Sequence, residues 1–235
     1  MSESRVKTAS LRALVDEILR GDDFEARLPE LTRMPARRVI NPLFASLCNP
    51  DELHKMRAAK AMGVIVADLA EQEMEAARVI MRRFMWNLND ESGGIGWGSP
   101  EAMGEIMAAS PKLAKEYAHV LVSYLREDGN FLEHDMLQRG VLWALARLAG
   151  VRPQLLQNFG VYILPYLQSD DPALRGLAAK TLGLIGVDSA SPQLQQLLQD
   201  QSGIEFFLDG KIQPFTVSEL AKQALELMGP ARRAP

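Results

Sequence analysis

Two groups of three residues recur at intervals of four, the spacing that puts side chains on one face of a helix. The groups are Trp97, Glu101 and Glu105, and then Arg139, Trp143 and Arg147. Tryptophan and arginine are the residue types that supply most of the energy at interfaces, and carboxylates can hold guanidinium groups in place. We therefore predict a binding patch in which the two stripes lie side by side.

The same six residues have a plainer interpretation. Trp143 is then part of a helical core, and the charged residues form a solvated face with internal ion pairs of small net value. The sequence leaves both interpretations open. It predicts no catalytic residue in either of them.

The histidines form no metal-binding motif. His54, His119 and His134 are spread along the chain, and none of them precedes a glutamate. His134 stands between Glu133 and Asp135, but consecutive residues on a helix point in different directions, whereas ligands on helices need spacings of three or four. We predict no metal site and no cofactor.

A glycine-rich loop over residues 89–99 carries Trp97. Trp97 either covers a ligand or a neighbouring groove, or folds back to fill the gap beside a short helix at 100–109. A phosphate-binding loop is disfavoured, because no strand precedes the glycines, no lysine follows them and acidic residues flank them.

A repeated interval positions these residues. An apolar segment that ends in leucine is followed sixteen residues later by glycine, from Leu47 to Gly63, from Leu88 to Gly104 and from Leu167 to Gly183. A fixed offset between the end of one helix and a small residue in the next is typical of stacked helical hairpins.

The most complete copy spans residues 171–186, with an Asp-Pro turn, Arg175, an Ala-Ala pair and a Leu-Gly-Leu-Ile-Gly ending. This pattern resembles the HEAT repeat, and in particular the short bacterial HEAT-like repeats first described in phycobilin lyases. The resemblance covers roughly residues 35–229 and implies an all-α, right-handed α-solenoid of five to six HEAT-like helical hairpins. Such repeats occur in scaffolds, lyases, hydroxylases and glycosylases, so function does not follow from the fold.

Apolar periodicity and capping signals place the helices. The expected pairs are 36–47 and 53–70, 73–88 and 100–109, 111–126 and 134–149, 155–168 and 172–186, and 192–200 and 217–228. Serine, aspartate or asparagine before proline marks several helix starts, among them Asn49-Pro50, Ser99-Pro100 and Asp171-Pro172. Aligned copies give one column on the second helices, formed by Lys60, Glu101, Trp143, Lys180 and Gln223.

We predict a single domain over residues 1–235, with N-terminal capping helices in 1–34, repeats in 35–229 and a disordered tail at 230–235. A β-hairpin is inserted in the last repeat at 203–216, where Asp209-Gly210 is a strong two-residue turn signal. Its aromatic residues either shield the end of the solenoid or, less readily because of Pro214, offer an edge to a partner's strand.

Composition limits the partners. The formal charge of −4 comes from 26 basic and 30 acidic residues, and neither half of the chain has a basic excess. Nucleic acid is therefore a disfavoured partner, although a local patch can escape such a sum. A single cysteine, Cys48, excludes an internal disulfide, and no run reaches membrane-spanning length, so we expect a cytoplasmic protein without a membrane partner.

These observations favour a non-enzymatic scaffold that binds a protein or peptide on the concave surface of its second helices. The alternative is an enzyme similar to the HEAT-like DNA glycosylases, with Trp97 and Trp143 against a damaged nucleotide and Glu101 as the stabilising acid. A bilin lyase is a further alternative that rests on the resemblance alone.

Overall fold

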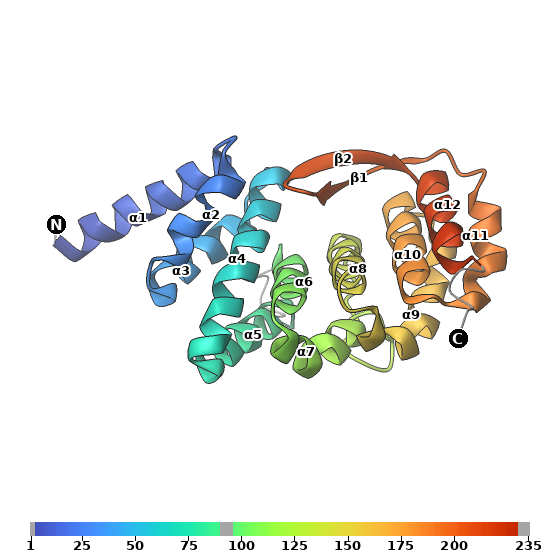
Figure 1. The fold of residues 1–235 in the computed structure, drawn as a ribbon, viewed down its shortest axis with the longest axis horizontal. Helices are drawn as coiled ribbons and strands as arrows, with labels where there is room; N and C mark the ends of the chain where they lie inside the picture. The colour runs from blue at the N-terminus through green and yellow to red at the C-terminus, as the bar shows by residue number, and fades with distance from the viewer. Residues whose placement is uncertain (1–2, 90–95, 230–235) are drawn as a thin grey trace. The chain divides into compact units, whose positions relative to one another are not determined.

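The computed structural model describes residues 3–89 and 96–229, and most of this part of the chain is helical (Figure 1). The predicted disordered tail at 230–235 and most of the glycine-rich loop at 89–99 lie outside the described residues. Trp97 itself is described. It lies in the turn that leads into the following helix.

The helices follow the predicted order of pairs. Their bounds are α1 Glu3–Arg20 and α2 Phe24–Thr32, α3 Ala36–Leu47 and α4 Glu52–Gln72, α5 Met74–Leu88 and α6 Ser99–Ala109, α7 Pro111–Ser123 and α8 Asp135–Ala149, α9 Gly160–Ile163 and α10 Pro172–Ile185, and α11 Ser191–Leu197 and α12 Val217–Met228. The strands are β1 Gly203–Leu208 and β2 Lys211–Thr216. The apolar period of each helix faces the core, which explains why the sequence placed them well.

The described chain divides into two compact units. One contains the residues up to Leu113 together with Asp209–Lys211, and the other contains Ala114–Leu208 and the residues from Ile212 on. We call them the first unit and the second unit. The single domain over residues 1–235 stays a prediction.

In the first unit, α4 packs against α3, α5 and α6. Phe44 of α3 and Phe84 of α5 meet in its core, with ring centroids 4.6 Å apart. A Cβ atom at Gly63 of α4 would lie 2.8 Å from the Cβ of Glu105 on α6. The glycine therefore allows α4 and α6 to approach closely, as the repeated interval predicts.

In the second unit, α10 lies between α8 and α12 (Figure 1). A Cβ atom at Gly183 of α10 would lie 2.5 Å from the Cβ of Ala224 on α12, so these helices also meet through a glycine. Arg175, at the start of α10, donates from Nε to Asp200 Oδ2 at 2.8 Å and from Nη1 to the Ser169 carbonyl oxygen at 2.7 Å. This side chain fastens the turn before α10 to the following repeat.

Capping differs from the prediction at two helix starts. Asp171 caps α10 by accepting from Ala173 N, as predicted. Asp51, and not Asn49, caps α4 by accepting from His54 N, while Asn49 accepts from Asp51 N and shapes the turn. Gly98, with a φ of 70°, precedes α6, and the predicted cap Ser99 is already helical.

The predicted helix at 155–168 is broken into short pieces. Only Gly160–Ile163 is α-helical, with 3₁₀ turns at Pro153–Leu155, Gln157–Phe159 and Leu164–Gln168. Pro165 lacks the N–H that a continuous α-helix would use. Gly160 also packs so closely on Val187 that a Cβ would meet its Cγ2 at 2.5 Å.

The β-hairpin forms where the sequence predicts it. Asp209 and Gly210 both have positive φ, 49° and 79°, which is the geometry of a two-residue type I′ turn. Phe206 of β1 stacks on Phe215 of β2 with ring centroids 4.5 Å apart. The start of α12 follows at once, and Thr216 and Glu219 make the predicted capping box.

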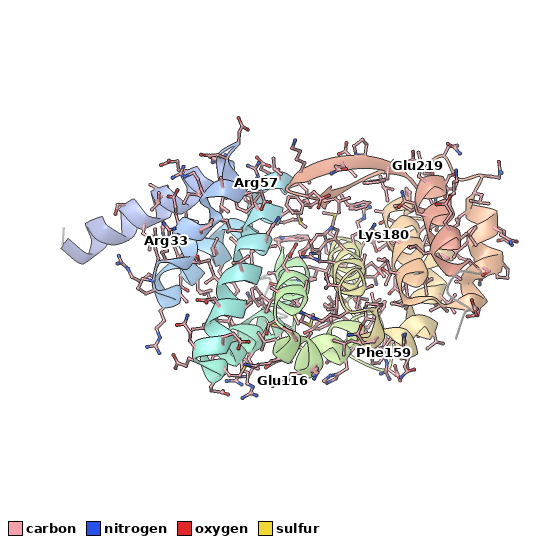
Figure 2. The ribbon with its side chains drawn as sticks, viewed as in Figure 1. Arg33, Arg57, Glu116, Phe159, Lys180 and Glu219 are labelled. Carbon is pink, nitrogen blue, oxygen red and sulfur yellow. The ribbon has the colours of Figure 1, made fainter. Side chains whose placement is uncertain are left out.

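His54 lies buried in the first unit beneath the α1–α2 turn, next to a fixed arginine. Arg57 donates from Nη1 to the carbonyl oxygens of Leu19 at 2.9 Å and Gly21 at 3.0 Å (Figure 2). His54 Nε2 lies 3.8 Å from Asp16 Oδ1, and its Nδ1 has no hydrogen-bond partner among the described residues. Burial lowers the pKa of His54 from its ordinary value, against the opposing charge of Asp16.

The first prediction concerns the close approach of α10 and α12. Gly183→Ala places a Cβ against the Ala224 backbone, which cannot rotate away. We expect a net loss of about 1 to 2 kcal/mol in the free energy of unfolding, because overpacking outweighs the gain in helix propensity. Urea unfolding measures it. Gly203→Ala is the control, since no described atom lies within 4 Å of its Cβ, and an equal loss there would contradict the packing argument.

The second prediction concerns pH. Because the pKa of His54 is lower in the folded state, the unfolded state binds more protons below the ordinary value of about 6.5. The free energy of unfolding should therefore fall as the pH falls from about 7.5 towards the folded pKa. His54→Gln should flatten this slope in urea unfolding, and His119→Gln, at an exposed position, should keep it. Equal slopes in both variants would refute the assignment.

Candidate functional site

The two predicted stripes belong to different units. Trp97, Glu101 and Glu105 lie in the first unit, and Arg139, Trp143 and Arg147 lie in the second. Their predicted arrangement side by side stays a prediction. Within each unit, however, the surroundings of each side chain are well defined.

The acidic residues of α6 are buried. Glu101 is 6% exposed and Glu105 is 5% exposed. Glu101 Oε1 lies 3.5 Å from Lys55 Nζ of α4, and its Oε2 accepts no hydrogen bond from any described residue. Burial raises the pKa of the Glu101 carboxyl, and the charge of Lys55 opposes this rise. Glu101 thus lies in the packing of α4 against α6, and Glu105 lies against Gly63.

Arg139 lies at the start of α8 and forms an ion pair with Asp171, in the turn before α10. Arg175 makes the equivalent ion pair one repeat later, from the start of α10 to Asp200. In both cases an arginine near the start of a second helix therefore holds an acidic residue of the next repeat. Arg139 therefore links one repeat to the next through this ion pair.

Trp143 joins α8 to the β-hairpin. Its side chain is 7% exposed, and the indole Nε1–H donates to the Phe207 carbonyl oxygen of β1 at 3.2 Å. A buried indole needs a partner for its N–H, and here the strand supplies it. Most of the surface of Trp143 is thus buried in the core. The part that stays exposed lines a pocket.

This pocket, which we call the hairpin pocket, lies between α8, α10 and β1 and has a volume of about 190 Å³. Its walls are mostly apolar and include two basic side chains. The lining residues are Trp143, Ala146, Arg147, Gly150, Val151, Leu177, Lys180, Leu184, Phe206, Phe207 and Leu208. Lys180 (Figure 2) approaches the Phe206 ring, with Nζ 5.6 Å from the ring centroid. Among these described lining residues none is acidic.

Two residues of the sequence column, Trp143 and Lys180, line the hairpin pocket. Arg147 was assigned to the predicted patch and lines it too. The aromatic wall from Phe206 and Phe207 was missed as a site component, because only the fold brings β1 to α8.

Sequence reasoning also missed Trp86 of α5, which is 74% exposed. The signal was present. The buried residues of α5 are Ala77, Ile80, Met81, Phe84 and Leu88, which form one helical stripe. Trp86 falls on the opposite side of the helix from this stripe, so its exposure follows from the helical period.

Residues 3–89 and 96–229 hold no group of three or more histidine, cysteine, aspartate or glutamate residues arranged to bind a metal ion. No helix within these ranges has the length and apolar character needed to cross a membrane.

Known proteins resemble the chain in sequence and in fold. A family model for the HEAT-like repeat matches residues 135–185, from α8 to the end of α10. An uncharacterised protein of Archaeoglobus fulgidus is 24% identical over 184 residues, which cover 78% of this chain and 94% of the relative. This relative brings no function with it.

Among solved structures, an engineered protein has a TM-score of 0.54 at 19% identity and covers 93% of this chain and 96% of its own. A designed armadillo repeat protein in complex with the peptide (KR)4 has a TM-score of 0.51 at 16% identity, with 93% and 99% covered. These likenesses concern the fold alone. They confirm the predicted fold class, a helical repeat solenoid, and the family match adds that residues 135–185 resemble HEAT-like repeats.

The third prediction tests the bond that closes the hairpin pocket. Trp143→Phe keeps an aromatic ring but removes the N–H that reaches the Phe207 carbonyl oxygen. Leaving that acceptor without its donor should lower the free energy of unfolding by about 1 to 3 kcal/mol, measured in urea. Trp86→Phe makes the same change at an exposed position and should be nearly neutral. An equal effect of both changes would show that packing alone holds the hairpin.

Proposed function

We propose that this protein, which carries HEAT-like repeats, is a non-enzymatic interaction module whose hairpin pocket binds an apolar side chain of an acidic peptide. The observation that carries the proposal is the composition of the pocket wall. A mostly apolar wall, to which three aromatic residues contribute, is combined there with two basic residues on neighbouring helices.

The apolar wall sets the size and type of the bound group. Binding pockets in proteins are mostly apolar, with a few polar groups that fix orientation. The pocket has a volume of about 190 Å³, which suits one large side chain such as leucine or phenylalanine better than a cofactor. The Trp143 bond to β1 fixes this wall before a ligand arrives, so little ordering is needed on binding.

The two basic residues set the charge of the partner. Arg147 of α8 and Lys180 of α10 stand on neighbouring helices of the pocket wall. Carboxylates that flank the bound side chain would meet these cations and make charge-assisted hydrogen bonds. A basic peptide would be repelled by the same pair.

The likeness to the designed armadillo repeat protein supports a peptide as the ligand. That protein is in complex with the basic peptide (KR)4. In this chain the charged residues of the pocket wall are basic, so they favour an acidic peptide over a basic one. We therefore infer the same class of ligand, a peptide, with the opposite charge.

Only part of the wider patch predicted from the sequence belongs to the proposed site. Trp143 and Arg147 belong to the hairpin pocket. Arg139, with its Asp171 ion pair, supports the repeat beside it. A binding role for Trp97, Glu101 and Glu105 stays a prediction.

The fourth prediction tests the pocket with an array of ten-residue peptides. Each peptide carries glutamates around one central position, which is leucine, phenylalanine, alanine or lysine. We expect the leucine and phenylalanine peptides to bind best, and the corresponding all-lysine flanks to abolish binding. Arg147→Glu and Lys180→Glu should each weaken binding at least about tenfold in fluorescence anisotropy, because each turns an attraction into a repulsion.

Lys222→Glu is the matched control. It makes the same charge change at an exposed position of α12, outside the hairpin pocket, and should change the Kd by less than about twofold. Circular dichroism of each variant shows that the fold is intact. Binding that ignores both pocket substitutions, or that prefers basic flanks, would refute the proposed site.

A further inference from the structure

The outer face of α5 in the first unit exposes two large apolar side chains. Trp86 is 74% exposed and Val79 is 54% exposed. They are seven residues apart, two helical turns, and so lie on one side of the helix. The buried stripe of α5 occupies the other side. Scattered exposed apolar residues are ordinary, but an exposed tryptophan paired with a second apolar residue at this spacing is not.

Arginines surround this apolar pair. Arg82 and Arg83 lie four and three residues before Trp86, which places both beside it on the helix. Arg83 is held in place: its Nη1 donates to Asn41 Oδ1 of α3 at 2.7 Å, and its guanidinium carbon lies 3.8 Å from the centroid of the Phe44 ring. Arg82 Nη2 lies 2.5 Å from Glu75 Oε1, one turn before Val79. Arg83 is thus held in place before any partner binds.

The combination of apolar and charged side chains on this face favours one class of partner over the others. Tryptophan and arginine are the residues most enriched among interface hot spots. A phosphate backbone is a poorer match, because Glu75 stands among the arginines and a nucleic acid gains affinity from uninterrupted positive charge. A membrane surface is also a poorer match, since an interfacial helix needs a continuous apolar face and here arginines separate the two apolar residues.

We propose that the outer face of α5, formed by Glu75, Val79, Arg82, Arg83 and Trp86, is a docking surface for a second protein. The partner presents an apolar groove with an acidic rim. Trp86 and Val79 enter the groove as anchors two turns apart, which is how a helix face is read by a groove. The carboxylates of the rim pair with Arg82 and Arg83. This surface is separate from the hairpin pocket and does not depend on its function.

The fifth prediction uses a yeast-display library of small helical-bundle proteins with a randomised surface groove, selected on the full-length protein. We expect a class of binders whose grooves are apolar with acidic rims. Trp86→Ala should weaken these binders at least about tenfold, as loss of a hot-spot tryptophan does. Arg82→Glu should weaken them by about three- to tenfold, through charge repulsion.

Two variants are matched controls. Leu227→Ala shortens an exposed apolar side chain of α12, and Arg12→Glu reverses an exposed charge of α1. Both should leave the Kd of these binders within about twofold. Three other probes complete the test: a 20-nucleotide oligo(dT), vesicles with phosphatidylserine, and sedimentation of the protein alone.

The proposal fails if no selected binder loses affinity with Trp86→Ala, or if the binders that do so carry basic or neutral grooves. It also fails if Trp86 is needed for binding to oligo(dT), for binding to vesicles or for self-association, and not for binding to the selected proteins. Each of these results would assign the α5 face to another class of partner or to none. None of them bears on peptide binding at the hairpin pocket.

Discussion

The close approach of successive second helices is the constraint on which the rest of the structure depends. At Gly63 and Gly183 the helix has no side chain of its own on the side that faces its neighbour, and a Cβ at either position would collide with the adjacent helix. Interiors are close-packed, so this spacing fixes the positions of all residues one turn above and below. Trp143 and Lys180 line one pocket because the helices that carry them are packed side by side. The packing of successive repeats therefore creates the hairpin pocket and also holds its helices in position.

The β-hairpin adds what the repeat alone does not supply. Gly176 of α10 leaves room for Ile204 of β1, since a Cβ there would meet Ile204 Cδ1 at 2.5 Å. The strand is then held on its other edge by the indole of Trp143. The hairpin pocket lies beside this contact, between α8, α10 and β1. Because β1 alternates its side chains between two faces, Phe206 and Phe207 point to opposite sides of the strand.

Much of this fold could be predicted from the sequence, because periodicity and capping are local. The helix pairs, the hairpin turn at Asp209-Gly210 and the capping box at Thr216 each depend on residues within a few positions. The predicted helix at 155–168 failed for a local reason, because Pro165 lacks the N–H that a continuous helix uses. The contacts of Gly160 and Trp143 could not be predicted, since they depend on distant residues. Val187 packs on Gly160, and the partner of Trp143 is a carbonyl oxygen 64 residues away.

The net charge can be counted from the sequence, but only the structure shows where the charged residues lie. The formal charge of −4 disfavours nucleic acid when it is summed over the chain, yet the sum does not say where the arginines are. In the first unit Arg82 and Arg83 gather beside Trp86, with Glu75 among them. In the second unit Arg147 and Lys180 line an apolar pocket. Both places therefore combine aromatic surface with a few cations, whereas a surface that binds nucleic acid is marked by an extended field of positive charge.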